Sequence, residues 1–337
     1  MTSDLQPLIR ANGRELPKNG EGSKGSNGES TWLPIVRWFD LWAGIHHMRA
    51  EEARATVDWV RAIPLIVVHV LCLGVFLVGW SWTAVSLAIG LYFIRMFAIT
   101  GWYHRYFSHR TFKTSRACQF LFALLGASCA QRGPLWWAGH HRHHHVHSDK
   151  PEDTHSVRHG GFLWAHLGWI SSKKCFPPRL KVVQDFATFP ELRFLDRFAT
   201  LIPAVCGFGL FGVGKSLEVY APGLGTNGPQ LLIWGFFVST VALLHGTCTI
   251  NSLAHVYGSQ RYETGDDSKN NLFLALITLG EGWHNNHHHY AASTRQGFYW
   301  WEIDMTYYLL RAMQAMGLIW SIREVPARVR EGQHKLG

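Results

Sequence analysis

The chain has 337 residues, of which 47% are hydrophobic, 14% are aromatic and only 16% are charged. Soluble domains carry nearer a quarter of charged residues, so this chain with its 16 tryptophans is more typical of a membrane protein than of a soluble one. The net charge of +9 leaves two explanations open, namely binding of nucleic acid or basic loops on the cytoplasmic side of a membrane.

The first 31 residues form a polar segment that is rich in Gly, Asn, Ser and Lys. The segment lacks the apolar core of a secretory signal peptide. Its composition cannot bury enough apolar surface to order itself, so residues 1–31 are predicted to be a disordered tail.

Four apolar segments follow that can cross a bilayer as helices, since about 20 residues cover roughly 30 Å of hydrocarbon. The predicted spans are Ile63–Trp82, Thr83–Tyr103, Ala199–Val213 and Leu231–Ile250. The first two are separated by so short a turn that they form a helical hairpin, and Arg95 is the only charge in the second. Arg116–Gln131 is also apolar but shorter, so we expect a buried or re-entrant helix there.

The distribution of basic residues orients these spans. Of the 32 Lys and Arg residues, 30 lie in residues 1–61, 104–198 and 251–337, which four spans place on one side. The positive-inside rule makes that side cytoplasmic and explains the net charge without nucleic acid. Six cysteines, none in a CxxC pair, are expected to be reduced, buried thiols, as in a protein that faces the cytoplasm.

Three histidine clusters carry the most specific pattern, and each lies near a span end on the cytoplasmic side. The clusters are His104 with His109, then His141, His144 and His145, then His284, His287 and His288. The last two share the pattern HxxHH, whose three imidazoles fall within about 100° of arc on a helix and so point to one side. His104 and His109 are spaced i, i+5, which is too wide for one face, so we expect a metal at the helix end, reached from both sides. His143 faces away, while the angle leaves His140 open.

Eight clustered imidazoles are too many for one metal, so two metals are the economical interpretation. Ligating imidazoles usually donate a hydrogen bond from their second ring N–H to a carboxylate or a carbonyl. The candidates for that role are Asp149, Glu152, Asp153, Asp267 and Glu281. The alternative is a histidine-rich membrane protein that binds or transports metal without catalysis. That class places ligands within the spans, where this chain has only isolated histidines such as His69 and His245, interpreted as satisfied helix histidines.

Four stretches together resemble the membrane fatty acyl desaturases, specifically the acyl-CoA Δ9 (stearoyl-CoA-type) branch. They read GWYHRYFSHRTFK, HHRHHHVHSDKPEDTHS, NSLAHVYG and GEGWHNNHHH, and the resemblance covers roughly residues 35–310. It implies an all-α membrane protein in which residues 32–337 form one desaturase domain. Four transmembrane helices would lie under a cytosolic helical cap that holds a di-iron centre beside a bent tunnel for the acyl chain.

The resemblance also implies the metal ligands by position. They are His104, His109, His141, His144, His145, His255, His284, His287 and His288, with Asn251 acting through a water. It adds His255 to the three clusters and favours His141 over His140. The roles of His140, His143 and His147 stay open, and His155 is placed near the substrate entrance.

Substrate contacts are implied in the same way. Gln131, Trp137 and Thr247 match residues near the bend of the tunnel, with Cys248 in place of a Trp, and Tyr92 matches a bulky residue that closes its far end.

The head group is a further expectation. Lys173 and Lys174 match a basic pair that contacts the phosphates of CoA. Where CoA-using relatives carry Arg-Asp before the second cluster, this chain has Gly139-His140, which leaves a phospholipid or carrier-protein ester as an alternative to acyl-CoA.

The reaction implied by the resemblance is an O₂-dependent desaturation that needs two iron ions and two electrons. The chain shows no haem, flavin or nicotinamide motif, so we expect an external donor such as a ferredoxin, a rubredoxin or cytochrome b5 with its reductase. The alternatives are an acyl-lipid desaturase and a related di-iron membrane hydroxylase. The expected location is a multi-pass membrane protein with a cytoplasmic active site, in a bacterial inner membrane or, in a eukaryote, the endoplasmic reticulum.

Overall fold

The computed structural model describes residues 33–43 and 56–332, so the predicted tail at residues 1–31 lies outside the described residues. The described chain is mostly helical and has almost no strand. Its two strands, β1 (Lys113–Thr114) and β2 (Ile319–Trp320), have two residues each and pair antiparallel. The expectation of an all-α protein therefore holds for this part of the chain.

Four helical segments are long and apolar enough to cross a membrane, which confirms the predicted number among the described residues. The first combines α2 (Trp59–Leu71), η2 (Cys72–Gly74) and α3 (Val75–Val78), and the second combines α4 (Trp82–Phe97) and the π-helix η3 (Ala98–Ser108). The third is α11 (Leu201–Tyr220), and the fourth combines α12 (Gly228–Gln230), the π-helix η7 (Leu231–Val238), α13 (Ser239–Asn251) and η8 (Leu253–His255).

The ends of the spans differ from the predicted ends for local reasons. The Asp58 side chain accepts a hydrogen bond from the Arg61 N–H, so α2 begins at Trp59, and Gly79 ends α3 with φ of +65°. Ser81 caps α4 in the same way, and the second span continues past Tyr103 as π-helix. Hydropathy alone does not register a capping side chain or a change of helix type.

The third span was predicted too short, because α11 continues beyond Val213 for two more turns to Tyr220. These turns carry Lys215 and Glu218, whose exposed charged groups pair at 2.9 Å. The charged pair at the end of the helix lowered its apparent hydropathy without ending it.

The two loops opposite the histidine clusters lie side by side. Trp234 Nε1 donates to the Gly79 carbonyl at 2.8 Å, and Thr83 Oγ1 donates to the Leu224 carbonyl at 2.8 Å. Side chains such as Phe76 and Leu77 are 84% and 90% exposed in the first span, as expected of a surface that meets lipid tails.

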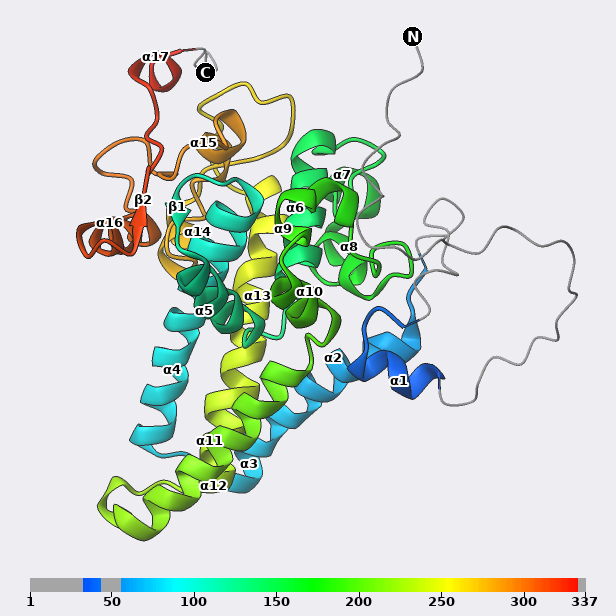
Figure 1. Cartoon of the computed structure of the whole chain (residues 1–337), viewed down its shortest axis with the longest axis vertical. Coiled ribbons are helices and arrows are strands. Elements are labelled where there is room, and N and C mark those ends of the chain that lie inside the picture. Colours follow the sequence, from blue (N-terminus) through cyan, green and yellow to red (C-terminus); the bar gives the residue numbers. More distant parts are fainter. Residues whose placement is uncertain (1–32, 44–55, 333–337) are drawn as a thin grey trace, which may run out of the picture. The chain divides into compact units, whose positions relative to one another are not determined.

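The remaining helices gather at the other end of the spans, where Figure 1 shows α4 and α13 running into them. We call residues 109–200 and 256–332 the short-helix layer. Its α-helices are α5 (Arg116–Ala127), α6 (Pro134–His147), α7 (Val157–Gly160), α8 (Phe162–His166), α9 (Gln184–Ala187), α10 (Pro190–Arg197), α14 (Leu272–Ile277), α15 (His284–His289), α16 (Met305–Ala315) and α17 (Ala327–Arg330). The 3-10 helices η4 (Gly168–Ser171) and η5 (Leu180–Val183) lie in the same layer, whereas α1 (Leu33–Phe39) precedes the first span and η6 (Pro222–Leu224) follows the third.

The predicted buried or re-entrant helix corresponds to α5, which ends at Ala127 and is too short to span. One face of α5 packs on η3, where Gly126 leaves room for the Tyr103 ring. The opposite face exposes Phe120 and Leu121, so α5 is only half buried.

Candidate metal centre and adjoining cavity

The nine histidines expected as ligands gather in two groups where the short-helix layer meets the ends of the second and fourth spans. In each group the ring nitrogens lie within 4.8 Å of one another. The five-histidine group contains His104, His109, His141, His145 and His287, and the four-histidine group contains His144, His255, His284 and His288. The structure therefore brings together residues that lie up to 184 positions apart in the chain.

Each HxxHH box is divided between the two groups, which corrects the expectation that its three imidazoles act on one side together. In α6, His141 and His145 belong to the five-histidine group, while His144 belongs to the other. In α15 the division is reversed, because His287 alone joins the five-histidine group. Positions i+3 and i+4 lie about 100° apart on a helix, so a box placed between two groups supplies both of them.

The i, i+5 pair of the first cluster is explained by π-helical winding. Residues 98–108 form a π-helix, and the His109 N–H donates to the His104 carbonyl at 3.2 Å, five residues back. This winding stacks positions five apart, so the two rings come within 4.9 Å of each other. Both therefore join one group, rather than reaching a metal from two sides of a helix end.

Four of the imidazole rings contact a carboxylate through Nδ1, on the side of the ring opposite to Nε2. The pairs are His144 with Asp153 at 3.0 Å, His255 with Asp149 at 2.9 Å, His288 with Asp266 at 2.7 Å, and His104 with Glu281. An Nδ1–H that donates to a carboxylate leaves Nε2 as the free lone pair, and it fixes the plane of the ring. These four rings are therefore oriented with Nε2 toward the centres of the groups.

Three of the five carboxylates expected in this role make such contacts, namely Asp149, Asp153 and Glu281. Asp267 was the wrong member of an adjacent pair, because Asp266 contacts the ring while Asp267 pairs with exposed Arg158 at 2.7 Å.

The remaining candidate, Glu152, is exposed, and no contact of its carboxylate is seen among the described residues.

The Asp153 carboxyl is held in its ionised form. Burial alone would raise its pKa, but His155, His144 and backbone N–H groups outweigh burial and hold that pKa far below its ordinary value.

A buried ion network supports Glu281. Arg105 lies next to the ligand pair on η3, and its Nη2 donates to Glu281 Oε1 at 3.0 Å. Its Nη1 donates to Asp304 Oδ2 at 2.9 Å and to the Thr294 carbonyl at 2.8 Å. Arg105 therefore ties the second span to the C-terminal part of the short-helix layer, a role that its position in the sequence did not reveal.

The donor set fits a metal. Nε2 atoms face one another at 3.0 Å between His104 and His287 and at 2.9 Å between His109 and His141, and Nε2 of buried His144 has no hydrogen-bond partner among the described residues. Burial, together with the neighbouring imidazoles, lowers the pKa of His141 and His287 well below the ordinary value, so both rings are neutral. Neutral imidazoles that converge in a buried space suit iron, zinc or copper.

Asn251 ends α13 and belongs to neither imidazole group, but it lines the cavities beside His141. Its contact with a metal through a water stays a prediction.

The unassigned histidines have structural partners. His140 lies 3.1 Å from the Pro177 carbonyl, His143 lies 3.0 Å from the Glu152 carbonyl, and His147 packs on His143. His155 is buried between His144 and Trp169 and lines the larger cavity, and its place near the substrate entrance stays a prediction.

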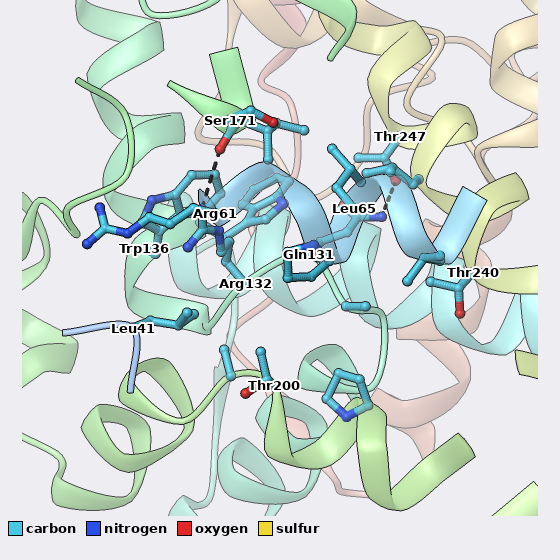
Figure 2. A pocket seen from close by; sticks show the side chains of 18 of the residues that line it. Leu41, Arg61, Leu65, Gln131, Arg132, Trp136, Ser171, Thr200, Thr240 and Thr247 are labelled. Atoms are coloured by element: carbon cyan, nitrogen blue, oxygen red, sulfur yellow. Dashed lines mark hydrogen bonds between the residues drawn. The ribbon is translucent and has the colours of Figure 1, made fainter. Parts of the chain in front are cut away.

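Two cavities meet beside the imidazoles. The larger has a volume of about 240 Å³ and lies among α1, α2, α6, α11 and α13, and the smaller has about 40 Å³ and lies between η3 and α13. Both are lined by Trp137, His141, Thr247 and Asn251, so they adjoin at the metal groups. Gln131 Nε2 donates to Thr247 Oγ1 at 3.0 Å at this junction (Figure 2).

The expected tunnel residues are thus partly placed. Trp137 and Thr247 line both cavities and Gln131 lines the larger one, whereas Tyr92 lines neither. Tyr92 lies one turn of α4 before Met96, which does line the smaller cavity. The Tyr92 hydroxyl donates to the Ile277 carbonyl at 2.8 Å.

The two lysines expected at the head group line neither cavity, and Lys173 is exposed. Lys173 pairs through its backbone N–H with the Thr56 carbonyl at 3.0 Å.

Comparison with known proteins decides the family. A family model described as fatty acid desaturase matches residues 79–323. The chain belongs to the fatty acid desaturase family. It is therefore an oxidoreductase of lipid metabolism, and its four apolar helices fit the membrane-bound character of that family.

Three relatives illustrate the range of substrates within the family. The sn-1 stearoyl-lipid 9-desaturase of Anabaena variabilis is 33% identical over 279 residues, which cover 81% of this chain and 97% of that protein. The chloroplastic palmitoyl-monogalactosyldiacylglycerol delta-7 desaturase of Arabidopsis thaliana is 36% identical over 250 residues, 72% of this chain and 63% of that protein. An acyl-CoA 5-desaturase of Anemone leveillei is 35% identical over 294 residues, 83% and 87% of the two chains. These desaturases differ in both the carrier of the acyl chain and the position of the double bond.

Proposed function

We propose that the protein is an O₂-dependent fatty acyl desaturase that forms a cis double bond at the Δ9 position of a saturated chain. The observation that carries this proposal is the junction of two cavities at His141, beside two groups of buried imidazoles. The nine histidines would hold two iron ions, with Asn251 acting through a water. With O₂ and two electrons from a separate protein, the bound iron would supply the oxidation that removes one hydrogen from each of two adjacent methylenes.

The chain's own contribution is to hold the substrate in register. Methylenes are chemically alike, so the position of the double bond depends on how deeply the acyl chain enters. The Trp137 ring stacks on His141 at 5.1 Å, and the bond between Gln131 and Thr247 closes the wall of the junction. A chain that passes from the larger to the smaller cavity would bend at this point, with the bent methylenes nearest the imidazoles.

The carrier of the acyl chain is better supported as a lipid than as CoA. At Gly139, where CoA-using relatives carry Arg, an added Cβ would lie 3.1 Å from Arg179 Cβ, so a longer side chain there would require Arg179 to move by a few tenths of an ångström. Lys173 and Lys174 line neither cavity. Of the three relatives named above, two are lipid-linked desaturases and one is an acyl-CoA desaturase.

Electrons would come from an acidic donor, for which a ferredoxin, a rubredoxin or cytochrome b5 with its reductase are suitable classes. The basic segments of the chain suit such a partner. The site would face the cytoplasm, because the positive-inside rule places the basic segments and the short-helix layer on that side.

The test is expression in a desaturase-deficient host with a competent electron donor, followed by mass-spectrometric profiling of fatty acids. The expected product of the wild-type chain is a Δ9 cis-unsaturated acid, which His144→Ala should abolish. A hydroxy acid with no new double bond would instead establish the hydroxylase alternative. Absence of any product from protein that contains iron would favour a non-enzymatic metal-binding protein.

A further inference from the structure

Arginines line the larger cavity away from the imidazole groups. Arg37 on α1, Arg61 in the first turn of α2 and Arg132 just before α6 all contribute to its wall. Figure 2 shows Arg61, Arg132 and Trp136 together, with Thr247 and Thr240 to the other side and Gln131 between them. The cavity therefore has a cationic end and an end at the metal groups.

Two of these guanidinium groups are held in place by aromatic rings. Arg61 Cζ lies 3.8 Å and Arg132 Cζ lies 3.5 Å from the centroid of the Phe176 ring. Arg132 also lies over the Trp136 ring at 5.3 Å. Stacking fixes the planes of both guanidinium groups and leaves N–H groups at the edge of Arg132 available to a ligand.

The positive charge at this end of the cavity is only partly balanced. Asp58 lies 3.6 Å from Arg61, whereas Arg132 has no ion pair among the described residues and donates one hydrogen bond, to the Ile170 carbonyl at 3.4 Å. Burial, then the charge of Arg61, lowers the pKa of Arg132 to about 9. A buried cation without an ion pair is costly, so an oxyanion bound beside Arg132 would stabilise that residue.

The position of this cationic end suits a lipid. Arg61 lies in the first turn of a membrane span, which is the depth of the phosphate groups in a bilayer. Below it the cavity is lined by span residues such as Leu65, Val68 and Leu244. An acyl chain would thus lie among the spans while its head group stays beside the arginines.

The distance along α6 indicates which part of the substrate reaches the arginines. From Gly133 to His141 the helix advances about 12 Å at 1.5 Å per residue. An extended chain advances roughly 1.2 Å per bond, so about ten bonds separate the two ends. For a Δ9 substrate this places the carboxyl end of the acyl chain beside Arg132. The phosphate of a glycerophospholipid lies only the glycerol unit beyond that carboxyl end, whereas the phosphates of CoA lie a whole pantetheine arm beyond it.

Building on the proposed function, we infer that Arg61 and Arg132, with Arg37, bind an oxyanion at the head end of the substrate. Two sources share this chemistry, namely the phosphate of a glycerophospholipid and the carboxylate of an unesterified fatty acid. A neutral galactolipid has neither group. The site would therefore select among acyl lipids by the charge next to the ester.

The experiment measures binding to the purified full-length protein through quenching of its tryptophan fluorescence, since Trp38, Trp136, Trp137 and Trp169 line the cavity. Four probes carry the same brominated 18-carbon chain: lysophosphatidylglycerol, the free acid, monogalactosylglycerol and the CoA thioester. Displacement by the unbrominated probe isolates specific binding. The variants are Arg132→Gln, Arg61→Gln and Arg132→Lys, and the matched control is Arg116→Gln, which removes an exposed arginine paired with Glu191.

The expected result is that at least one of the two oxyanion probes binds at least tenfold more tightly than the galactolipid. Arg132→Gln should remove that preference without weakening the galactolipid, while Arg132→Lys keeps part of it and Arg116→Gln keeps all of it. A preference for lysophosphatidylglycerol identifies a phospholipid, and a preference for the free acid identifies an unesterified chain. The preference for an oxyanion probe over the galactolipid is measured on the wild-type protein alone. The inference can therefore still be refuted if Arg132→Gln does not fold.

Equal binding of all four probes by the wild type would overturn the inference. So would an equal loss for charged and neutral probes in Arg132→Gln, which is the pattern of a merely structural arginine. A loss confined to the CoA thioester would overturn it as well. Desaturation is measured separately in the same preparation. Preference without product refutes the proposed function alone, and product without preference refutes the oxyanion site alone.

Discussion

Asp153→Asn tests whether the carboxylates behind the histidines are required by the metal centre. Both carboxylate oxygens of Asp153 lie 3.0 Å from His144 Nδ1, and they also accept the backbone N–H groups of Asp149 at 3.0 Å and His155 at 3.2 Å. All of these partners are donors. An asparagine amide carries an NH₂ group at one of the two positions, so in either orientation it would face a donor.

The cost can be worked from these contacts. Losing one hydrogen bond to a buried charged group costs about 1.5–3 kcal/mol, and each 1.4 kcal/mol corresponds to a tenfold change in an equilibrium constant. Metal affinity at the four-histidine group should therefore fall about 10- to 100-fold, in line with other substitutions behind metal-ligating histidines. The five-histidine group does not contain His144 and should keep its metal.

The assay is metal content by mass spectrometry of purified protein, combined with fatty acid profiling. Asp153→Asn should lower the content from about two metals per chain toward one and abolish most product. The neighbouring exposed carboxylate offers a matched control, because Glu152→Gln removes the same charge one residue away. Two retained metals with normal product in Asp153→Asn would refute the reasoning, as would an equal loss in Glu152→Gln.

Three further predictions follow from the same structure. His144→Ala should lose metal and product, whereas His140→Ala removes a buried ring outside both groups and should keep both, as measured by metal content and product yield; equal losses would contradict the division of the HxxHH box. Tyr92→Ala should let longer acyl chains into the smaller cavity. Tyr92→Phe removes only the hydrogen bond to Ile277 and should keep the wild-type chain-length profile of the products. A wild-type profile in both variants would exclude Tyr92 from the end of the tunnel. Burial raises the pKa of Asp196 from 3.8 to about 6, so its ionisation opposes folding and the folded protein should lose up to about 3 kcal/mol as pH rises from 4 through 6. Thermal unfolding of Asp196→Asn should lack this contribution, and equal pH profiles for wild type and variant would contradict it.

Much of the fold follows from local properties of the chain. Hydropathy identifies the four spans and the basic-residue counts predict their orientation, because insertion into a bilayer depends on each segment's own composition. Eight of the nine expected ligands are equally local, since they stand in three histidine clusters that the sequence alone displays, whereas His255 was added only by the family resemblance. The exact ends of the spans required the caps at Asp58 and Ser81, which act through single hydrogen bonds that hydropathy does not register.

The tertiary structure decided which histidines, carboxylates and arginines lie together. Only the folded chain divides each HxxHH box between two groups, because the division depends on where α6 and α15 lie relative to η3. Only it distinguishes Asp266 from Asp267, which differ by one position and face opposite ways. The arginines of the larger cavity come from three distant segments, and each alone resembles an ordinary surface cation. Residue type and spacing determine what chemistry a side chain offers, whereas the packing of distant elements determines which partners it meets.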